Sequence, residues 1–167
     1  QIHLVGQWEE DEIHWGPLPI IAHSQSKNRH WKDDLVKAYK RFRNYGEPFV
    51  CITTNDTFSG DAVQQIVTRL KEEQNVLLII DEAHNFGAKR LAACLPQNIK
   101  NRIALSATIE RYRDKKGTQL LFEYFGEKCI EYDVEQAIKD GALTRYRYYP
   151  VPVYLEPDEL YEYHLLT

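Results

Sequence analysis

The sequence predicts an α/β fold in which a parallel sheet is buried on both faces by helices. Three observations support this prediction. Several short aliphatic runs do not alternate with polar residues, which is typical of strands covered on both sides. The stretches between the runs place apolar residues at helical spacing. Polar side chains directly follow two of the runs, where α/β sheets bind their ligands.

Four runs are predicted as strands, and the segments between them as helices. The strands are expected at residues 17–23, 48–54, 75–80 and 101–107. A mixed, basic segment follows the first run, and a short helix is expected near residues 87–95. Between the second and third strands, residues 61–74 carry apolar side chains on one helical face, with Ser59 or Asp61 as the expected N-cap.

The character of the sequence changes after about residue 110. Two short helices are expected at 117–126 and 134–141, each closed by its terminal glycine. Residues 145–155 are predicted to be extended and are rich in tyrosine, while their two prolines argue against a central strand position. A further helix is expected to begin near Pro157.

Length and composition limit the class of protein. A chain of 167 residues is long enough for one domain with a substantial core, and its net charge of −4 gives no overall basic surface for nucleic acid. Three widely spaced cysteines indicate reduced core thiols in an intracellular, cytoplasmic protein. No apolar run has the length of a membrane helix, and no signal peptide is recognisable. Because the chain begins with Gln1 and contains no methionine, we expect it to be a fragment of a longer polypeptide.

Two carboxylates and an imidazole follow the most apolar run, which extends from Val76 to Ile80. Asp81 and Glu82 would lie at the carboxyl end of this strand, with His84 close behind. Adjacent carboxylates there suit a hard divalent cation such as Mg²⁺, and one of them can orient an attacking water. The alternative interpretation is a solvated acidic turn, with the histidine capping it.

A second polar set follows the next aliphatic run. Ser106, Ala107 and Thr108 end the strand predicted at 101–107, so both sets should emerge at the same edge of the sheet. The pair "DEAH" (81–84) and "LSAT" (105–108) resembles motifs II and III of a superfamily 2 helicase of the DEAD/DEAH-box class. The resemblance implies a RecA-like P-loop NTPase fold.

The resemblance extends over nearly all of the chain. "LVGQWEED" (4–11) resembles the end of motif Ia, although Gln7 and Trp8 are weak candidates, because a tryptophan on a helix is more often a core residue. "CITTNDTF" (51–58) resembles the threonine-bearing segment that contacts the nucleic-acid backbone. The stretch from 124 to 155 is similar to the exit from the first RecA-like domain in the branch of DNA-repair helicases and type III restriction subunits. Ile109 departs from that branch, which usually has proline after "SAT".

The resemblance implies a role for each residue of the first set. Asp81 would hold Mg²⁺, usually through water, and Glu82 would polarise the water that attacks the γ-phosphate of ATP. His84 would couple the nucleotide site to motif III and to the facing domain.

It also implies roles for the hydroxyl-bearing residues. Ser106 and Thr108 would bond the motif II side chains, although either can simply be a polar strand end. Thr53 and Thr54 would bind phosphate oxygens of nucleic acid, although threonine is common in strands. The basic side chains between 37 and 43 are more simply explained as a solvated helix face.

One essential motif of the family is not found in the chain. No G-x-x-x-x-G-K-[ST] phosphate-binding loop (Walker A) occurs in the 167 residues. We therefore expect residues 1–142 to be the C-terminal part of a first RecA-like domain, and residues 143–167 to lead to a second one. ATP and Mg²⁺ would be used by the longer protein.

The predicted function is part of the ATPase motor of an ATP-dependent DNA helicase or translocase. DNA is favoured over RNA as its partner, together with the remainder of the same polypeptide. Two rivals remain: the motor subunit of a restriction or defence system that translocates duplex DNA, and a non-catalytic nucleic-acid-binding module. A dedicated metallohydrolase is the weakest alternative, because H-E-x-x-H is absent.

Overall fold

The computed structural model describes residues 2–12, 16–71 and 75–166, which form two compact units. The first unit ends at Glu127 and the second begins at Lys128. The predicted domain boundary at 142/143 concerns a longer protein and remains a prediction. None of the described helices is both long and apolar enough to span a membrane.

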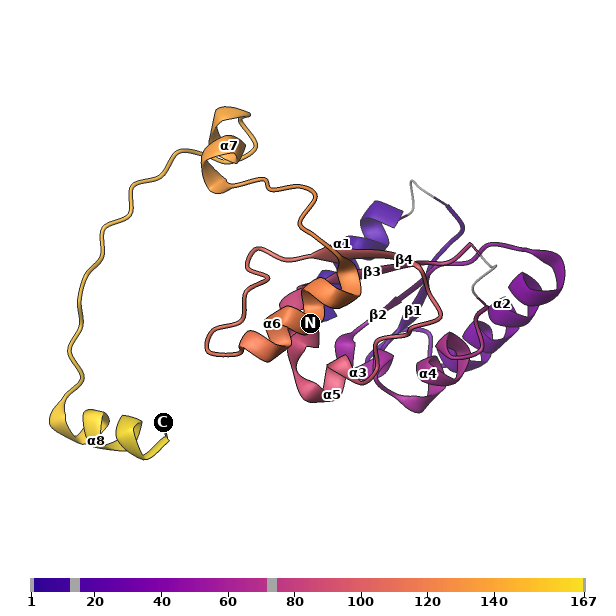
Figure 1. Cartoon of the computed structure of the whole chain (residues 1–167), viewed down its shortest axis with the longest axis horizontal. Helices are drawn as coiled ribbons and strands as arrows, with labels where there is room; N and C mark the ends of the chain where they lie inside the picture. Colours follow the sequence, from indigo (N-terminus) through magenta and orange to yellow (C-terminus); the bar gives the residue numbers. More distant parts are fainter. Residues whose placement is uncertain (1, 13–15, 72–74, 167) are drawn as a thin grey trace. The chain divides into compact units, whose positions relative to one another are not determined.

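The first unit is a mixed α/β structure with two small parallel sheets (Figure 1). One sheet pairs β1 (Ile20–Ala22) with β2 (Cys51–Thr53), and the other pairs β3 (Leu77–Asp81) with β4 (Asn101–Leu105). Three strands fall within the predicted runs, β3 extends one residue beyond its run to Asp81, and both pairings are parallel as predicted. The expected single sheet is instead two two-stranded sheets in the described structure.

Helices occupy the connections between strands, as the sequence predicts. The helical elements of this unit are α1 (Ile2–Glu12), α2 (Trp31–Tyr45), α3 (Asn55–Phe58), α4 (Asp61–Val67), η1 (Ala83–Gly87), α5 (Lys89–Ala92) and α6 (Lys115–Phe125). Helix α2 contacts β1 and α4, α1 contacts β2, and α6 contacts β4 and η1. The chain is therefore built from short β–α units, which is the arrangement that brings parallel strands together.

Two details of the predicted helices are corrected. The helix expected at 61–74 ends at Val67, and residues 72–74 lie outside the described part of the chain. Its N-cap is Gly60, because Ser59 ends the preceding helix α3 and donates its hydroxyl to the carbonyl of Asp56. The helix expected near 87–95 is two short pieces, the 3₁₀ turn η1 and α5.

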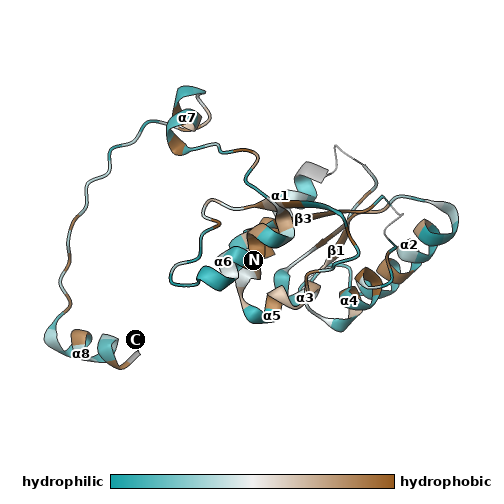
Figure 2. Cartoon of the chain, in the orientation of Figure 1, coloured by the Kyte–Doolittle hydropathy of each residue, from teal (hydrophilic) through white to brown (hydrophobic). Residues whose placement is uncertain are grey.

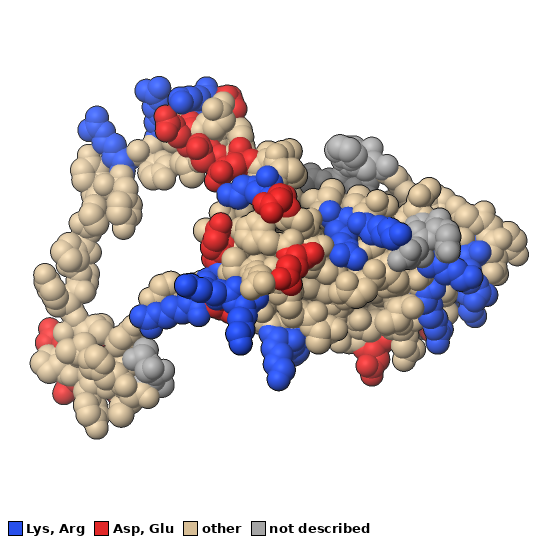
Figure 3. Space-filling view, viewed as in Figure 1, with Lys and Arg blue, Asp and Glu red and all other residues tan. Residues whose placement is uncertain are grey.

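The core lies between the strands and the helices that cover them. Phe86 of η1 and Leu121 of α6 are the largest fully buried side chains among the described residues. The Phe86 ring packs edge-to-face against Phe58, with ring centroids 5.8 Å apart. Figure 2 shows the strands as hydrophobic and the outer turns of α2 as hydrophilic. Figure 3 shows lysine and arginine side chains gathered over α2, which fits the interpretation of this segment as a solvated face.

One face of the β3–β4 sheet is not covered as predicted. Leu77, Ile79, Ile103 and Leu105 share this face in register and remain between 40 and 54% exposed. The opposite face contains Ile80, which is buried near η1 and α6. The prediction that the run from Val76 to Ile80 is buried on both faces is therefore wrong for the described structure, because helices cover only one side of it.

The second unit contains two helices and an extended segment. Helix α7 (Val134–Lys139) begins at Asp133, whose carboxylate accepts the N–H of Gln136 at 2.7 Å. Helix α8 (Pro157–Leu166) begins where proline was expected to start it. Residues 145–155 form neither helix nor strand, which agrees with the argument against a central strand position, and they expose most of their aromatic and aliphatic side chains.

Thiol reactivity tests the packing of β2. Burial raises the pKa of the Cys51 thiol to about 12, whereas Cys129 is exposed. Because the thiolate is the nucleophile, we expect iodoacetamide to modify Cys129 rapidly and Cys51 only after denaturation. Peptide mapping after timed alkylation measures both rates in one sample. Equal rates in the native protein would contradict the packing of β2.

Candidate functional site

The parallel register of β3 and β4 brings the two predicted polar sets to one edge. Asp81 is the last residue of β3 and pairs with Leu105, the last residue of β4. The residues that follow, Glu82 and Ser106, therefore leave the sheet side by side. The structure thus places next to each other the two segments that resemble motifs II and III.

Both carboxylate oxygens of Asp81 are held by hydrogen bonds. Oδ1 accepts the main-chain N–H of Glu82 at 2.9 Å, and Oδ2 accepts the indole N–H of Trp8 at 3.2 Å. Each oxygen keeps a further lone pair, so the carboxylate is oriented but can still bind a cation or its water. Trp8 comes from α1, which links the motif Ia segment directly to Asp81.

The contact of Trp8 with Asp81 is a feature of the candidate site that the sequence interpretation did not predict. The sequence favours a core position for Trp8, and nothing in its spacing from Asp81 indicates a contact. The available signal was chemical: a partly buried indole N–H needs an acceptor, and a carboxylate is the strongest acceptor nearby.

Glu82 has an unusual backbone conformation. Its φ of 50° and ψ of 47° lie in the left-handed region, which costs a non-glycine residue about 1–2 kcal/mol. This conformation ends β3 and starts η1 within one residue. The Glu82 carboxylate consequently lies 3.3 Å from Nδ1 of His84.

His84 joins Glu82 to Ser106. Its Nδ1 lies 3.1 Å from the Ser106 hydroxyl oxygen as well as 3.3 Å from the Glu82 carboxylate. The Ser106 hydroxyl donates its own proton to the carbonyl of Thr108 at 3.0 Å. Because the carboxylate and the Ser106 oxygen can then only accept, Nδ1 is the protonated nitrogen of the ring.

The motif III residues contribute unequally to this chain of contacts. Ser106 bonds His84 through its side chain, as predicted for a coupling residue. Thr108 takes part through its main-chain carbonyl, while Ala107 and Thr108 are both exposed. The structure therefore brings Ser106 to the motif II side chains but does not bring the Thr108 hydroxyl there.

Arg111 holds the main chain at His84 in place through a hydrogen bond. Its guanidinium donates to the carbonyl of His84 and, through Nε, to the Asp114 carboxylate at 2.7 Å. Asp114 also caps α6 by accepting the N–H of Gly117 at 2.8 Å. The Arg111 hydrogen bond, aided by that of Gly117, holds the pKa of Asp114 below its ordinary value.

The predicted nucleic-acid residues Thr53 and Thr54 lie at the end of β2. Thr54 is the N-cap of α3, and its hydroxyl oxygen accepts the N–H of Thr57 at 3.4 Å and contacts the Thr57 hydroxyl at 3.1 Å. The Thr53 hydroxyl donates to the carbonyl of Thr54. The Thr54 hydroxyl thus caps α3 and the Thr53 hydroxyl makes a local main-chain contact, two structural roles that the sequence interpretation did not include.

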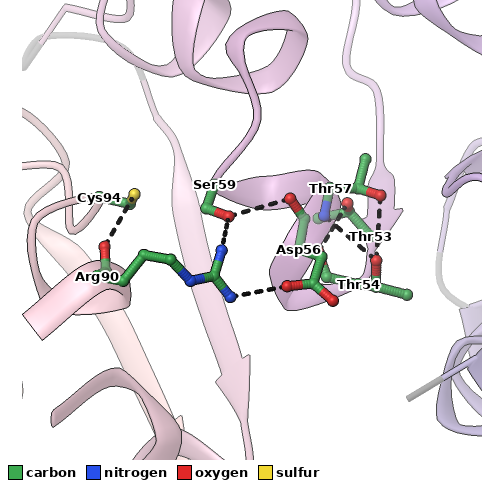
Figure 4. A network of polar contacts seen from close by, with 7 residues as sticks. All are labelled: Thr53, Thr54, Asp56, Thr57, Ser59, Arg90 and Cys94. Atoms are coloured by element: carbon green, nitrogen blue, oxygen red, sulfur yellow. Dashed lines mark hydrogen bonds and ion pairs between the residues drawn. The ribbon is translucent and has the colours of Figure 1, made fainter. Parts of the chain in front are cut away.

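Arg90 connects the turn after β2 to helix α5, which follows the DEAH residues in the sequence (Figure 4). Its guanidinium donates to the Ser59 hydroxyl at 2.8 Å and pairs with Asp56 at 2.7 Å. Arg90 belongs to α5, and the two acceptors belong to α3 and its C-cap. A polar network therefore connects the Thr54 turn with the segment that begins at Asp81.

The close packing of η1 against α6 is testable by adding a methyl group. A Cβ at Gly87 would clash with the Arg111 side chain and approach the carbonyl of Gly117. We expect Gly87→Ala to destabilise the first unit by about 1–3 kcal/mol, as overpacking does. Gly16→Ala is the matched control, because a Cβ there meets no atom within 4 Å. Thermal unfolding monitored by circular dichroism compares the two, and equal melting temperatures would contradict the packing.

The Asp114 ion pair predicts a pH dependence. Because the folded-state pKa is depressed, the stabilisation is present above the ordinary pKa of 3.8 and is lost as pH falls through the folded-state value. We therefore expect Asp114→Asn to lower the melting temperature at neutral pH. The difference from the unsubstituted protein should shrink as the pH falls below 3.8. A difference that stays constant with pH would show that the carboxylate charge is not responsible.

Comparison with known proteins identifies the family. The family model for the SWI2/SNF2 ATPase matches residues 21–159, a span that contains the whole edge from Asp81 to Thr108. No curated protein and no solved structure matches the chain. The match supports a helicase-like ATPase of superfamily 2 and does not distinguish the predicted branch. Since the matched span covers most of the 167 residues, the chain belongs to the SWI2/SNF2 ATPase family.

Proposed function

We propose that this chain is the part of a DNA translocase motor that carries the water-activating half of the ATPase centre. The single observation that carries the proposal is the contact chain from Glu82 through His84 to Ser106, beside the oriented carboxylate of Asp81. The family match supports the ATPase chemistry, and ATPases of this type act on nucleic acid, usually DNA.

The donor set at this edge fits Mg²⁺. Carboxylate oxygens are the ligands that Mg²⁺ prefers, and it commonly uses one or two of them with water and phosphate oxygens. Among the described residues, no group of three or more His, Cys, Asp or Glu side chains could form a cage for a metal. Asp81, aligned by its two hydrogen bonds, would hold the ion through water when the nucleotide is bound.

Glu82 is the residue that would orient the attacking water. Its side chain is 44% exposed, so it can reach a water at the edge of the sheet. Nδ1 of His84 lies 3.3 Å from this carboxylate and thereby orients it. When ATP is bound, its γ-phosphate supplies the centre that this water attacks.

The contact between His84 and Ser106 gives a physical route that couples the nucleotide site to the chain after β4. A rotation of Glu82 toward a water would break its contact with Nδ1 and leave His84 bonded to Ser106 alone. The loop that begins at Ser106 follows β4 and leads past Arg111 into α6. In this proposal, the state of the nucleotide is therefore transmitted to the segment that follows "SAT".

The isolated 167-residue chain is expected to hydrolyse almost no ATP. It contains no G-x-x-x-x-G-K-[ST] loop to hold the phosphates, so the water activated by Glu82 would lack a positioned target. A phosphate-release assay on the purified chain, with and without duplex DNA, measures this. Robust turnover that is lost in Glu82→Gln would contradict the expectation.

The role of Glu82 is tested in a polypeptide that joins this chain to such a loop. Glu82→Gln keeps the shape and hydrogen bonding of the side chain but removes the base, so turnover should fall by about 10²–10⁴-fold while ATP binding persists. Glu127→Gln, an exposed residue outside the site with the same charge change, should leave turnover unchanged. Equal activity of the two variants would overturn the proposed role.

The nucleic-acid dependence of the same assay separates the predicted rivals. A translocase on duplex DNA should be stimulated by double-stranded oligonucleotides, and an unwinding enzyme by single strands. A non-catalytic module would show no turnover with either ligand, even with the phosphate-binding loop present.

A further inference from the structure

The main chain of Glu82 is held on both sides by side chains. Its N–H donates to the Asp81 carboxylate at 2.9 Å, and its carbonyl oxygen accepts the side-chain amide of Asn85 at 3.0 Å. The same carbonyl also accepts the main-chain N–H of Asn85 at 3.0 Å. Asn85 therefore supplies two donors to one oxygen, and both lone pairs of that oxygen are used.

Only one of these two bonds depends on the asparagine side chain. A main-chain bond between residues three apart is what any 3₁₀ turn makes, and η1 makes another from the N–H of Ala88 to the carbonyl of Asn85. The side-chain bond is additional. Because a carbonyl can only accept, the Asn85 atom that faces it is the amide nitrogen. An ionised aspartate of the same shape would offer no donor there, and alanine would offer no polar group.

The side-chain bond acts at a residue with an unfavourable backbone conformation. Among the described non-glycine residues, only Glu82 and Arg113 have a positive φ. The left-handed region is costly for a residue with a Cβ, and glutamate is not one of the residue types that adopt it readily. The conformation of Glu82 must therefore be stabilised by its contacts, and the Asn85 amide supplies one of them at the carbonyl of Glu82 itself.

The rest of the turn has a fixed position. Ala83 is fully buried, and Arg111 donates a hydrogen bond to the carbonyl of His84. The carbonyl groups of the two residues that flank Ala83 thus both accept a hydrogen bond from a side chain. Asn85 holds the first of these carbonyls, at the residue whose carboxylate lies 3.3 Å from Nδ1 of His84.

We propose that Asn85 is a positioning residue for Glu82. Its amide holds the left-handed backbone, and that backbone directs the Glu82 carboxylate to His84 at the edge of the sheet. Asn85 acts through the main chain and touches neither the nucleotide nor the attacking water. The effect on catalysis rests on the proposed function, whereas the effect on the backbone can be measured without it.

The first experiment measures the backbone of Glu82 in the 167-residue chain without ATP. The three-bond coupling between its amide and α protons, together with its ¹³Cα and ¹³Cβ chemical shifts, reports φ. Asn85→Ala and the isosteric Asn85→Asp should both move these values away from the left-handed conformation. Both should also change the ¹⁵N chemical shift of Nδ1 of His84, because the Glu82 carboxylate moves away from it. Glu82 values equal to those of the unsubstituted chain would overturn the proposal.

Asn98 provides a matched control before the start of β4. Its side-chain amide donates to the carbonyls of Val67 and Leu70 at 2.8 and 2.7 Å, so Asn98→Ala removes the same kind of hydrogen bond outside the Asp81–Ser106 edge. This variant should lower the melting temperature and leave the Glu82 values unchanged. Equal changes of the Glu82 values in Asn98→Ala and Asn85→Ala would indicate a general loosening and overturn the specific role.

The second experiment measures turnover in the polypeptide that joins this chain to a phosphate-binding loop. Asn85→Ala and Asn85→Asp should lower kcat by about 10–10²-fold, because a misdirected catalytic group slows the chemical step. The Kd of a fluorescent ATP analogue should change little, since ground-state binding does not depend on where the Glu82 carboxylate points. Asn98→Ala should leave kcat unchanged.

The two experiments together separate this inference from the proposed function. A loss of kcat in Asn85→Ala with unchanged Glu82 backbone values would show that Asn85 acts directly, and would overturn the positioning role. Unchanged kcat in Asn85→Ala, in a polypeptide that Glu82→Gln inactivates, would overturn this inference alone. Turnover that survives Glu82→Gln would overturn the proposed function, while the backbone measurement would still decide whether Asn85 holds Glu82.

Discussion

The parallel pairing of β3 with β4 is the constraint on which the candidate ATPase edge depends. It sets Asp81 opposite Leu105, so the residues after each strand must emerge together. A shift of one residue would send every side chain of β3 to the opposite face. The left-handed backbone of Glu82 then turns the chain immediately, which keeps the carboxylate close to His84 instead of letting it extend away from the sheet.

Arg111 and Trp8 hold this edge from two sides. Arg111 donates hydrogen bonds to the carbonyl of His84 and to the carboxylate of Asp114, the N-cap of α6. Trp8 of α1 donates its indole N–H to Asp81. The catalytic candidates are therefore positioned by side chains from elements far away in sequence. In each of the two units one helix begins with an aspartate N-cap, Asp114 for α6 and Asp133 for α7.

Much of the fold could be predicted because local chemistry determines it. Each aliphatic run became a strand, and the paired motifs at 81–84 and 105–108 came together because parallel strands end at the same edge. The exposed face around Ile79 and Ile103 could not be predicted, since an aliphatic run does not reveal whether a helix covers its second side. The Trp8 contact with Asp81 depends on long-range packing, which leaves no periodic signal in the sequence.

The spacing of two prolines in the tail has a consequence for how that segment can pair. In an extended chain, residues two apart direct their main-chain groups to the same edge, so Pro150 and Pro152 both remove an N–H from one side of the 145–155 segment. The other edge keeps its donors at Tyr149, Val151 and Val153. The segment is therefore one-sided: it can complete a sheet as its outermost strand, but it offers poor hydrogen bonding to any strand beyond it. The N–H groups missing at the two prolines therefore limit edge-to-edge aggregation through this segment, whose aromatic and aliphatic side chains are exposed.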